Sequence, residues 1–242
     1  MSDYAHNILA PKLNPVDKAL LFRYFTWLFN DGFETNDFTR WSGTSVAAGC
    51  SLTTEQLHVH HGRYNARAVT DGLVNYQGAA PFFTVPNRND IYVRSYNKVL
   101  SHNINADADR IFFTGINMVT ASGLMGGWKR TGGVIKWAIT TRIAAAFVDT
   151  FSAGPLPAVN TWYCVELYWF YNAVNGIARM WVNGLLHCQK TGDTTNYGQC
   201  IGFGTGGVAQ CAGFVACDVV ADCCVAADAY IGLEPKLTAQ VI

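Results

Sequence analysis

The sequence contains few charged side chains. Asp, Glu, Lys and Arg make up 14% of the 242 residues, and 17 basic residues balance 17 acidic ones, so the formal net charge is zero. An average soluble domain has about 25% charged residues. Nucleic acids and anionic membrane surfaces select strongly basic proteins, so we expect neither of them as a partner.

The sequence also lacks a recognisable secretory signal peptide and a membrane-spanning stretch. Its first apolar run, Ala19–Phe29, is interrupted by Arg23, begins well inside the chain and has no small-residue cleavage site. The run is too short to cross a bilayer, so we expect no membrane insertion. The protein is expected either to stay in the cytosol or to leave the cell by another route, such as packaging into a particle.

Two kinds of cofactor motif are absent or incomplete. The eight cysteines contain no Cys-x-x-Cys pair, which disfavours a zinc site built from cysteines and favours buried thiols or disulfides. Residues Gly202–Gly207 match the pattern Gly-x-Gly-x-x-Gly, but Val208–Val215 after them does not resemble a helix. A dinucleotide site needs that helix to present its N-terminal amides to the phosphates, so we expect none.

Carboxylates are too few for a typical glycosidase. Such an enzyme needs two of them on either side of the scissile bond. The chain has four glutamates and no Glu-x-Asp-x-x-Glu strand motif; they are Glu34, Glu55, Glu166 and Glu234. A polysaccharide lyase can use arginine, histidine and tyrosine instead. Residues of these types are present, although they are also ordinary on a sheet face; they are Arg94, Tyr96, His60 and His61.

What the sequence does contain is a strong strand pattern. Thr161–Tyr171 and Ile177–Val182 are rich in β-branched and aromatic residues, and Asn183-Gly184 leads the chain into Leu185–Gln189. Asn-Gly between apolar alternations is a strong hairpin signal. Both alternating faces of Thr161–Tyr171 are apolar, which predicts a central strand of a two-layer sandwich.

Further segments are expected to be strands or loops. Strands are predicted at Asp31–Trp41, at Leu57–Val69 and at Arg110–Met118, and a glycine-rich loop is predicted at Leu124–Gly133. On the second of these strands His58 and His60 would share a face and offer two imidazoles to a metal. Because no third ligand is visible nearby, a solvated polar face is the favoured interpretation.

Several short motifs resemble one superfamily. They are Phe33–Trp41 (Phe-Glu-x-x-Asp-Phe-x-x-Trp), His61–Arg67 (His-Gly-x-Tyr-x-Ala-Arg), Ile91–Tyr96, the hairpin from Trp162 to Leu185, and Asp222–Gly232. Together they resemble the concanavalin A-like (laminin G-like) jelly-roll superfamily and related β-sandwich carbohydrate-binding modules. The resemblance implies an all-β fold, a two-sheet antiparallel jelly-roll sandwich, which we expect over residues 29–242. Residues 1–28 before it are expected to form an extended N-terminal arm.

The resemblance also implies a possible structural calcium, and no other cofactor is expected. The positions that match the family's calcium ligands are Glu34 and Asp222, with Asp37 and Asp218 as helpers. Carboxylates and backbone carbonyls are suitable calcium ligands. The alternative is that Glu34 simply accepts hydrogen bonds from loop amides.

A glycan site would need exposed aromatic faces beside polar groups. We consider Trp128 in its glycine-rich loop, Tyr171 at a strand end and Tyr197 in a polar loop as candidates. The arm carries Pro11 and Pro15 and no periodicity, which predicts an extended segment that docks on a neighbouring subunit. Its apolar side chains for such a contact are Tyr4, Ile8, Leu9 and Leu13.

The functional expectation from these observations is a non-enzymatic structural or surface protein. It would assemble with copies of itself or with a capsid or shell protein, as a virion decoration, capsid or fibre subunit on a virion or extracellular particle surface. Glycan binding is compatible with this expectation. The first alternative is a carbohydrate-binding, lectin-like module. The second is a polysaccharide lyase or hydrolase.

Overall fold

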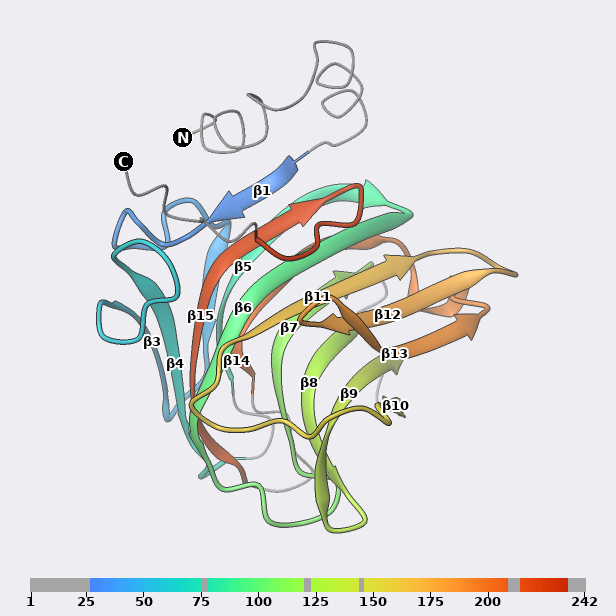
Figure 1. The fold of residues 1–242 in the computed structure, drawn as a ribbon. Helices are drawn as coiled ribbons and strands as arrows, with labels where there is room; N and C mark the ends of the chain where they lie inside the picture. Colours follow the sequence, from blue (N-terminus) through green and yellow to red (C-terminus); the bar gives the residue numbers. More distant parts are fainter. Residues whose placement is uncertain (1–26, 75–77, 120–122, 144–145, 209–213, 235–242) are drawn as a thin grey trace, which may run out of the picture.

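Two antiparallel β-sheets packed face to face form the protein (Figure 1). The computed structural model describes residues 27–74, 78–119, 123–143, 146–208 and 214–234. The predicted all-β, two-sheet jelly-roll sandwich is therefore confirmed. The arm, with Tyr4, Ile8, Leu9 and Leu13, lies outside the described residues, and its docking role stays a prediction.

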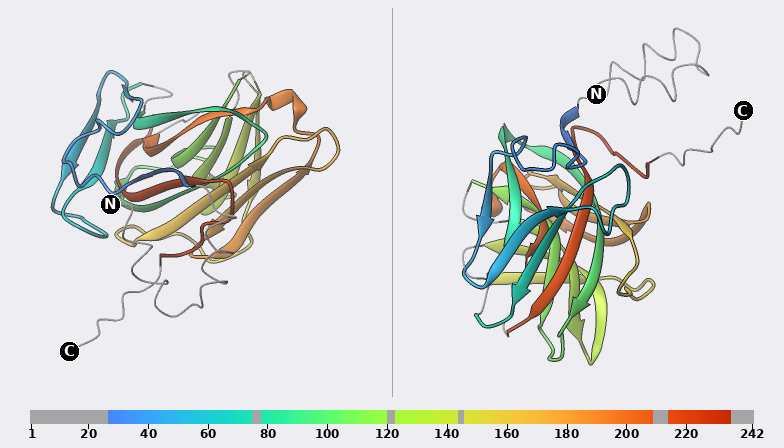
Figure 2. Two further views of the ribbon diagram at one scale, coloured as in Figure 1. Left: turned by 90° about the horizontal axis from the view of Figure 1, so that it is seen from above. Right: turned by 90° about the vertical axis from the view of Figure 1, so that its left-hand side faces the viewer.

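Each sheet is assembled from strands distant in sequence. Sheet 1 contains, in spatial order, β13 (Leu185–Gly192), β12 (Gly176–Val182), β11 (Tyr163–Phe170), β6 (Asp90–His102), β15 (Ala216–Ala227), β4 (Asn65–Asp71) and β3 (Cys50–Glu55), and β1 (Trp27–Asp31) also pairs with β15. Sheet 2 contains β10 (Ala146–Phe151), β9 (Val134–Ile143), β8 (Gly123–Thr131), β7 (Arg110–Met118), β14 (Cys200–Val208), β5 (Ala79–Arg88) and β2 (Gly43–Val46). Figure 2 shows the two layers from above and from the side.

The predicted meander is confirmed. β11 pairs with β12 on one side and with β6 on the other, and β12 pairs with β13. The turn between β12 and β13 has positive φ angles at Asn183 (50°) and Gly184 (79°), as a two-residue hairpin turn requires. β11 is thus an interior strand, as the apolar character of both its faces predicted.

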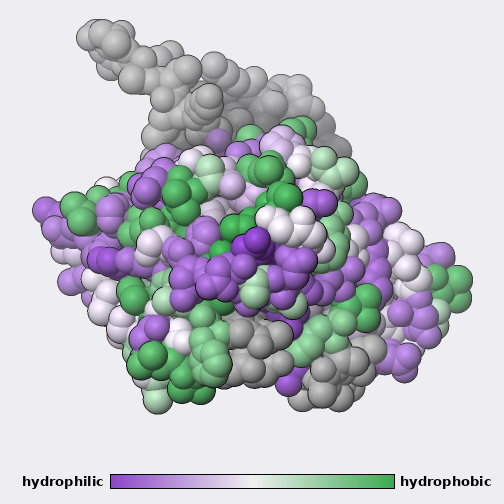
Figure 3. Space-filling view, turned by 90° about the horizontal axis from the view of Figure 1, so that it is seen from below, coloured by the Kyte–Doolittle hydropathy of each residue, from purple (hydrophilic) through white to green (hydrophobic). Residues whose placement is uncertain are grey.

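The core lies between the sheets and is rich in aromatic side chains. Trp128 of β8 and Trp137 of β9 pack edge to face, with ring centroids 6.0 Å apart, and both are 1% exposed. Buried aromatic pairs of this kind contribute beyond their burial of apolar area. In the view from below, hydrophobic surface residues lie in several separate patches among hydrophilic ones (Figure 3).

The predicted glycine-rich loop at Leu124–Gly133 is wrong, because most of it is strand β8. A side chain at Gly126 would meet Leu167 at 2.7 Å, and one at Gly127 would meet the backbone oxygen of Ile111 at 2.0 Å. These glycines therefore mark close packing within a sandwich rather than a turn. The prediction that Trp128 binds glycan is wrong for the same reason, because its side chain is buried in the core.

Two predicted strands near the N-terminus are also corrected. The chain turns after Asp31, where the Phe33 amide donates to the Asp31 carboxylate (3.1 Å) and the Asn36 amide donates to the Phe33 carbonyl (2.8 Å). Residues 56–64 form a loop, and only the following residues form a strand, β4. His58 and His60 consequently do not share a strand face.

Among the described residues the helical content is a single 3-10 turn, η1 (Thr195–Tyr197). No helix in that part of the chain has the length and apolar character that crossing a bilayer demands. Gly202–Gly207 lies within strand β14.

The buried position of Trp128 gives a test of the core. Trp128→Ala is expected to lower the free energy of unfolding by about 3–5 kcal/mol, because it leaves a large cavity between two sheets. Trp27→Ala, at a side chain that is 44% exposed, is the matched control and should cost much less. Denaturant unfolding of both variants measures the difference, and equal losses would contradict the packing described here.

Candidate functional site

The outer face of sheet 1 gathers polar and aromatic side chains. Along β6, Ile91 and Val93 join the core, while Tyr92, Arg94 and Tyr96 point the other way, because side chains alternate along a strand. The neighbouring strand β11 is in register with β6, and its outward residues include Glu166, opposite Arg94, and Tyr168, opposite Tyr92. One solvent-side surface therefore carries several residues able to bind or react.

The segment after β15, residues 228–234, crosses this surface (Figure 1). The Glu166 carboxylate accepts the amides of Ile231 (2.8 Å) and Gly232 (2.9 Å). Arg94 donates to the Gly232 carbonyl at 2.8 Å and to the Glu234 carboxylate at 3.2 Å. Two buried side chains of opposite charge, from adjacent strands, thus hold the segment against the sheet.

Glu166 is 1% exposed, and its burial has an electrostatic consequence. Desolvation raises the pKa of its carboxyl to about 7, although the two segment amides and the Arg94 guanidinium favour the charged form. The Glu166 carboxyl that contacts the segment therefore changes between its neutral and its charged form near neutral pH.

One end of this surface is an aromatic platform, which we define as Tyr92, Tyr168, Trp181 and Tyr230. The Tyr92 and Tyr168 rings stack with centroids 4.2 Å apart, and the Tyr230 ring lies 5.2 Å from Trp181 and 6.2 Å from Tyr92. The three strand aromatics are half-buried and Tyr230 is 45% exposed. The platform is thus partly exposed to solvent.

Polar groups border the platform. Arg179 of β12 lies opposite Tyr168 in the strand register and donates to Gln189 of β13 at 2.7 Å. An aromatic surface with hydrogen-bonding groups beside it has the two features that glycan recognition needs.

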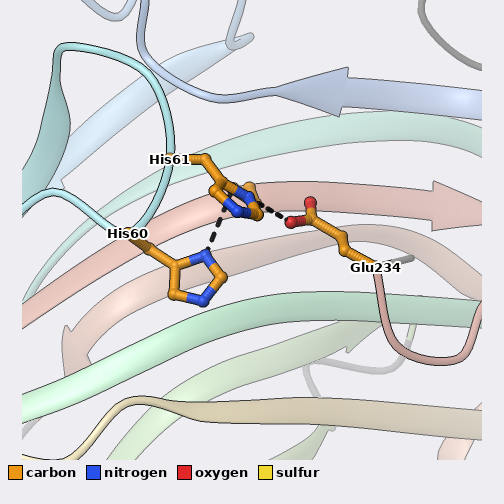
Figure 4. Close-up of side chains that lie close together, drawn as sticks. His60, His61 and Glu234 are labelled. Atoms are coloured by element: carbon orange, nitrogen blue, oxygen red, sulfur yellow. Dashed lines mark hydrogen bonds and ion pairs between the residues drawn. The ribbon is translucent and has the colours of Figure 1, made fainter. Parts of the chain in front are cut away.

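The other end of the surface is an ionisable corner formed by His60, His61, Cys223 and Glu234. Figure 4 shows His60, His61 and Glu234 of this corner. His61 Nδ1 lies 2.5 Å from Glu234 Oε2, and Cys223 Sγ lies 3.8 Å from His61 Nδ1 and 3.9 Å from His60 Nδ1. Burial and the neighbouring His61 lower the pKa of His60 to about 4, so its ring is neutral at physiological pH.

The corner is built on the carboxylate of Asp222, which is fully buried. It accepts the amides of His60 and His61, both at 3.0 Å, and that of Cys223 at 2.7 Å. Here β15 contains an irregularity in its pairing with β6, and Cys223 has a positive φ of 51°. The bulge turns the Cys223 side chain towards the histidines, while Cys224 faces the core.

The carboxylates considered for calcium are engaged with other donors. Both oxygens of Glu34 accept the Arg63 amide, at 2.9 and 3.1 Å, which is the alternative weighed from the sequence. Asp218 pairs with Arg67 at 2.6 Å, and Asp37 accepts its own loop's Thr39 amide at 3.1 Å. In this arrangement these residues and Asp222 do not fit a calcium ion, because the ion would have to displace the N–H donors that their carboxylates now bind. Calcium binding stays a prediction.

The other two glycan candidates are not part of the platform as defined. Tyr197 is 5% exposed, and its hydroxyl bonds Thr141 at 3.1 Å and Lys190 at 2.8 Å, so it is a structural residue. Tyr171 is half-buried beside β11, where its amide donates to the Asn89 carbonyl at 2.6 Å. Its role in glycan binding stays a prediction.

The four lyase candidates do come together. The His60 ring stacks on Tyr96, with centroids 3.9 Å apart and an interplanar angle of 22°, and the Arg94 guanidinium lies 5.6 Å from the Tyr96 ring centre. The Tyr96 hydroxyl accepts the Glu234 amide at 3.1 Å, and burial raises the pKa of Tyr96. Segment 228–234 therefore covers the polar atoms of Arg94 and Tyr96.

A second charged cluster lies on the outer face of sheet 2. Arg110 and Lys129 both approach the carboxylate of Asp149, and Thr140 donates a hydrogen bond to it. The Arg110 guanidinium also lies 4.4 Å from the ring centre of Phe147. The charges of this cluster are paired with one another, and the cluster contains no histidine. A structural role is therefore favoured over a catalytic one.

Comparisons with known proteins place the fold among carbohydrate-related structures. No family model and no curated protein matches the chain. Among solved structures, "Cellulose induced protein, Cip1" is similar with a TM-score of 0.64 and 19% identity over 85% of this chain and 100% of that one. An endo-β-1,4-glucuronan lyase from the fungus Trichoderma reesei is similar with a TM-score of 0.61 and 10% identity, over 87% and 99%.

The alginate lyase AlyC3 is also similar, with a TM-score of 0.50 and 11% identity over 68% of this chain and 75% of that one. Identities this low show a shared β-sandwich fold and no more. Our expectation of a virion decoration, capsid or fibre subunit is nevertheless wrong, because the solved structures with a similar fold include two lyases and a cellulose-induced protein. The expected absence of enzyme activity is corrected by the same finding.

Glu166 gives a pH test of how the segment is held. Its pKa is about 7 in the folded protein against an ordinary 4.5, so between these values the folded state keeps a proton that the unfolded state has released. The contribution of Glu166 to stability should therefore decrease as pH rises from about 4.5 to about 7, by on the order of 3 kcal/mol.

The measurement is denaturant unfolding of the unmodified protein and of Glu166→Gln between pH 5 and pH 8. Comparing the two removes the contributions of other titrating groups, His60 included. The unmodified protein should lose stability relative to the variant as pH rises, and a difference that is constant with pH would contradict the assignment.

Proposed function

We propose that the protein binds a polysaccharide chain on the outer face of sheet 1. The observation that carries this proposal is the aromatic platform, in which the ring centres of Tyr168, Trp181 and Tyr230 all lie within 6.2 Å of that of Tyr92. Sugar rings have apolar C–H faces, and burying them on aromatic rings removes both surfaces from water. Arg179 and Gln189 supply hydrogen-bonding groups at the edge.

The fold comparisons support polysaccharide as the ligand class. A cellulose-induced protein and lyases acting on glucuronan and alginate share this sandwich. A fold hosts many functions, so the argument rests on the platform, and the fold adds to its plausibility. Membership of the concanavalin A-like superfamily is part of the same proposal.

Polysaccharide cleavage at the ionisable corner is the second candidate function. Its specific support is the stack of His60 on Tyr96 with Arg94 beside it. In a lyase reaction on an acidic sugar, a base removes the proton beside the carboxyl group, a cation stabilises the resulting charge, and an acid protonates the leaving oxygen. Neutral His60, Arg94 and Tyr96 match these roles, provided that substrate displaces segment 228–234 from Arg94 and Tyr96.

The binding proposal predicts that Trp181→Ala weakens polysaccharide binding. We expect about tenfold lower affinity, the change that about 1.4 kcal/mol of lost stacking produces. Binding to cellulose, glucuronan and alginate is measured by depletion or calorimetry, with Trp27→Ala as the matched control because Trp27 is exposed on β1, outside the platform. Equal binding by both variants would overturn the role of the platform.

The cleavage candidate predicts that glucuronan or alginate is converted to unsaturated products, which absorb in the ultraviolet. His60→Ala should reduce that rate by about a hundredfold or more, the range of a lost general base. His58→Ala, in the same loop, is the control and should retain activity. A rate unchanged in both His60→Ala and Arg94→Ala would remove this candidate, while binding on the platform would be unaffected.

A further inference from the structure

The ionisable corner joins three chain segments that are far apart in sequence. His60 and His61 lie in loop 56–64, and Glu234 lies at the end of segment 228–234 (Figure 4). Cys223 lies in the bulge of β15. One ligand atom from each of the four residues lies within 4.8 Å of the other three. These atoms are two imidazole nitrogens, a thiol sulfur and a carboxylate oxygen.

Their spacing is close to that of a tetrahedral metal site. Zinc bonds of about 2.0 Å to nitrogen and about 2.3 Å to sulfur place sulfur and nitrogen roughly 3.6 Å apart. The observed distances from Cys223 Sγ to the two Nδ1 atoms are 3.8 and 3.9 Å. His61 Nδ1 and Glu234 Oε2, now 2.5 Å apart, would separate to roughly 3.3 Å around an ion.

Neighbouring residues hold the four ligands in place. Asp222 fixes the backbone of His60, His61 and Cys223 through three amide hydrogen bonds. Arg94 binds Glu234 Oε1 at 3.2 Å and leaves Oε2 facing the corner. Supporting contacts of this kind orient the ligands of metal sites and tune their affinity.

We propose that His60, His61, Cys223 and Glu234 bind one zinc ion. Thiolate and imidazole ligands suit zinc, whereas calcium takes oxygen ligands only. On binding, the Cys223 thiol releases its proton to solvent, and the thiolate with the Glu234 carboxylate balances the charge of the ion. Four protein ligands leave no open position, so the site is structural and ties segment 228–234 to loop 56–64.

This proposal is independent of polysaccharide binding, because the aromatic platform contributes no ligand. It does conflict with the cleavage candidate, since a His60 nitrogen bound to zinc is lost as a base. Zinc binding and cleavage through His60 are therefore alternatives for the same corner.

The test uses the full-length protein, stripped of metal by a chelator under reducing conditions and titrated with zinc alone in a calorimeter. We expect one equivalent to bind, and Cys223→Ser and Glu234→Gln to lower the affinity at least tenfold. Cys50→Ser and His58→Ala are matched controls that should bind as the unmodified protein does. Cobalt in place of zinc should give a thiolate charge-transfer band that Cys223→Ser abolishes.

Folding of each variant is checked by thermal unfolding without metal. Should Cys223→Ser fail to fold, His61→Ala replaces it, because the His61 side chain is 53% exposed and its loss leaves no cavity. Absence of stoichiometric binding, equal affinity in site and control variants, or a cobalt spectrum without the thiolate band would each overturn the zinc site. Trp181→Ala should bind zinc normally, which separates this result from the platform.

Discussion

The buried carboxylate of Asp222 is the contact on which the outer face of sheet 1 depends. A fully buried carboxylate is costly unless its oxygens are satisfied, and here three backbone amides satisfy them. Burial still raises the pKa of Asp222 to about 6. Because two of those amides belong to loop 56–64 and the third to β15, this one side chain places the loop on the sheet and fixes the orientation of Cys223.

Strand β6 connects this corner to the aromatic platform. Its outward residues Tyr92, Arg94 and Tyr96 run in sequence from the platform, through the contact with segment 228–234, to the stack with His60. Its inward residues Ile91 and Val93 are anchored in the core. The fixed spacing of side chains along one strand therefore sets the distance between the platform and the ionisable corner. Residues on a strand are positioned more precisely than residues on a loop.

Local sequence patterns predicted the fold well and the site only in part. The Asn183-Gly184 hairpin and the interior position of β11 were readable because turn chemistry and strand periodicity act over a few residues. The loop prediction for the glycines of β8 was wrong, because the close approaches that require them come from other strands, β11 of the opposite sheet at Gly126 and the neighbouring strand β7 at Gly127. Cys223 and Glu234 could not be assigned, because they meet His60 and His61 only through the fold, across more than 160 residues.

Tyr230 and Glu234 lie on the same short segment, and this links the platform to the corner. Tyr230 completes the platform beside Trp181, and Glu234 reaches His61. Between them, Gly232 is held by both Arg94 and Glu166. Whatever fixes Glu234 in the corner also restricts the motion of Tyr230, so less conformational entropy remains to be lost when a ligand stacks on the platform. If the platform binds polysaccharide as proposed, order in the ionisable corner should favour that binding through segment 228–234, which connects the two.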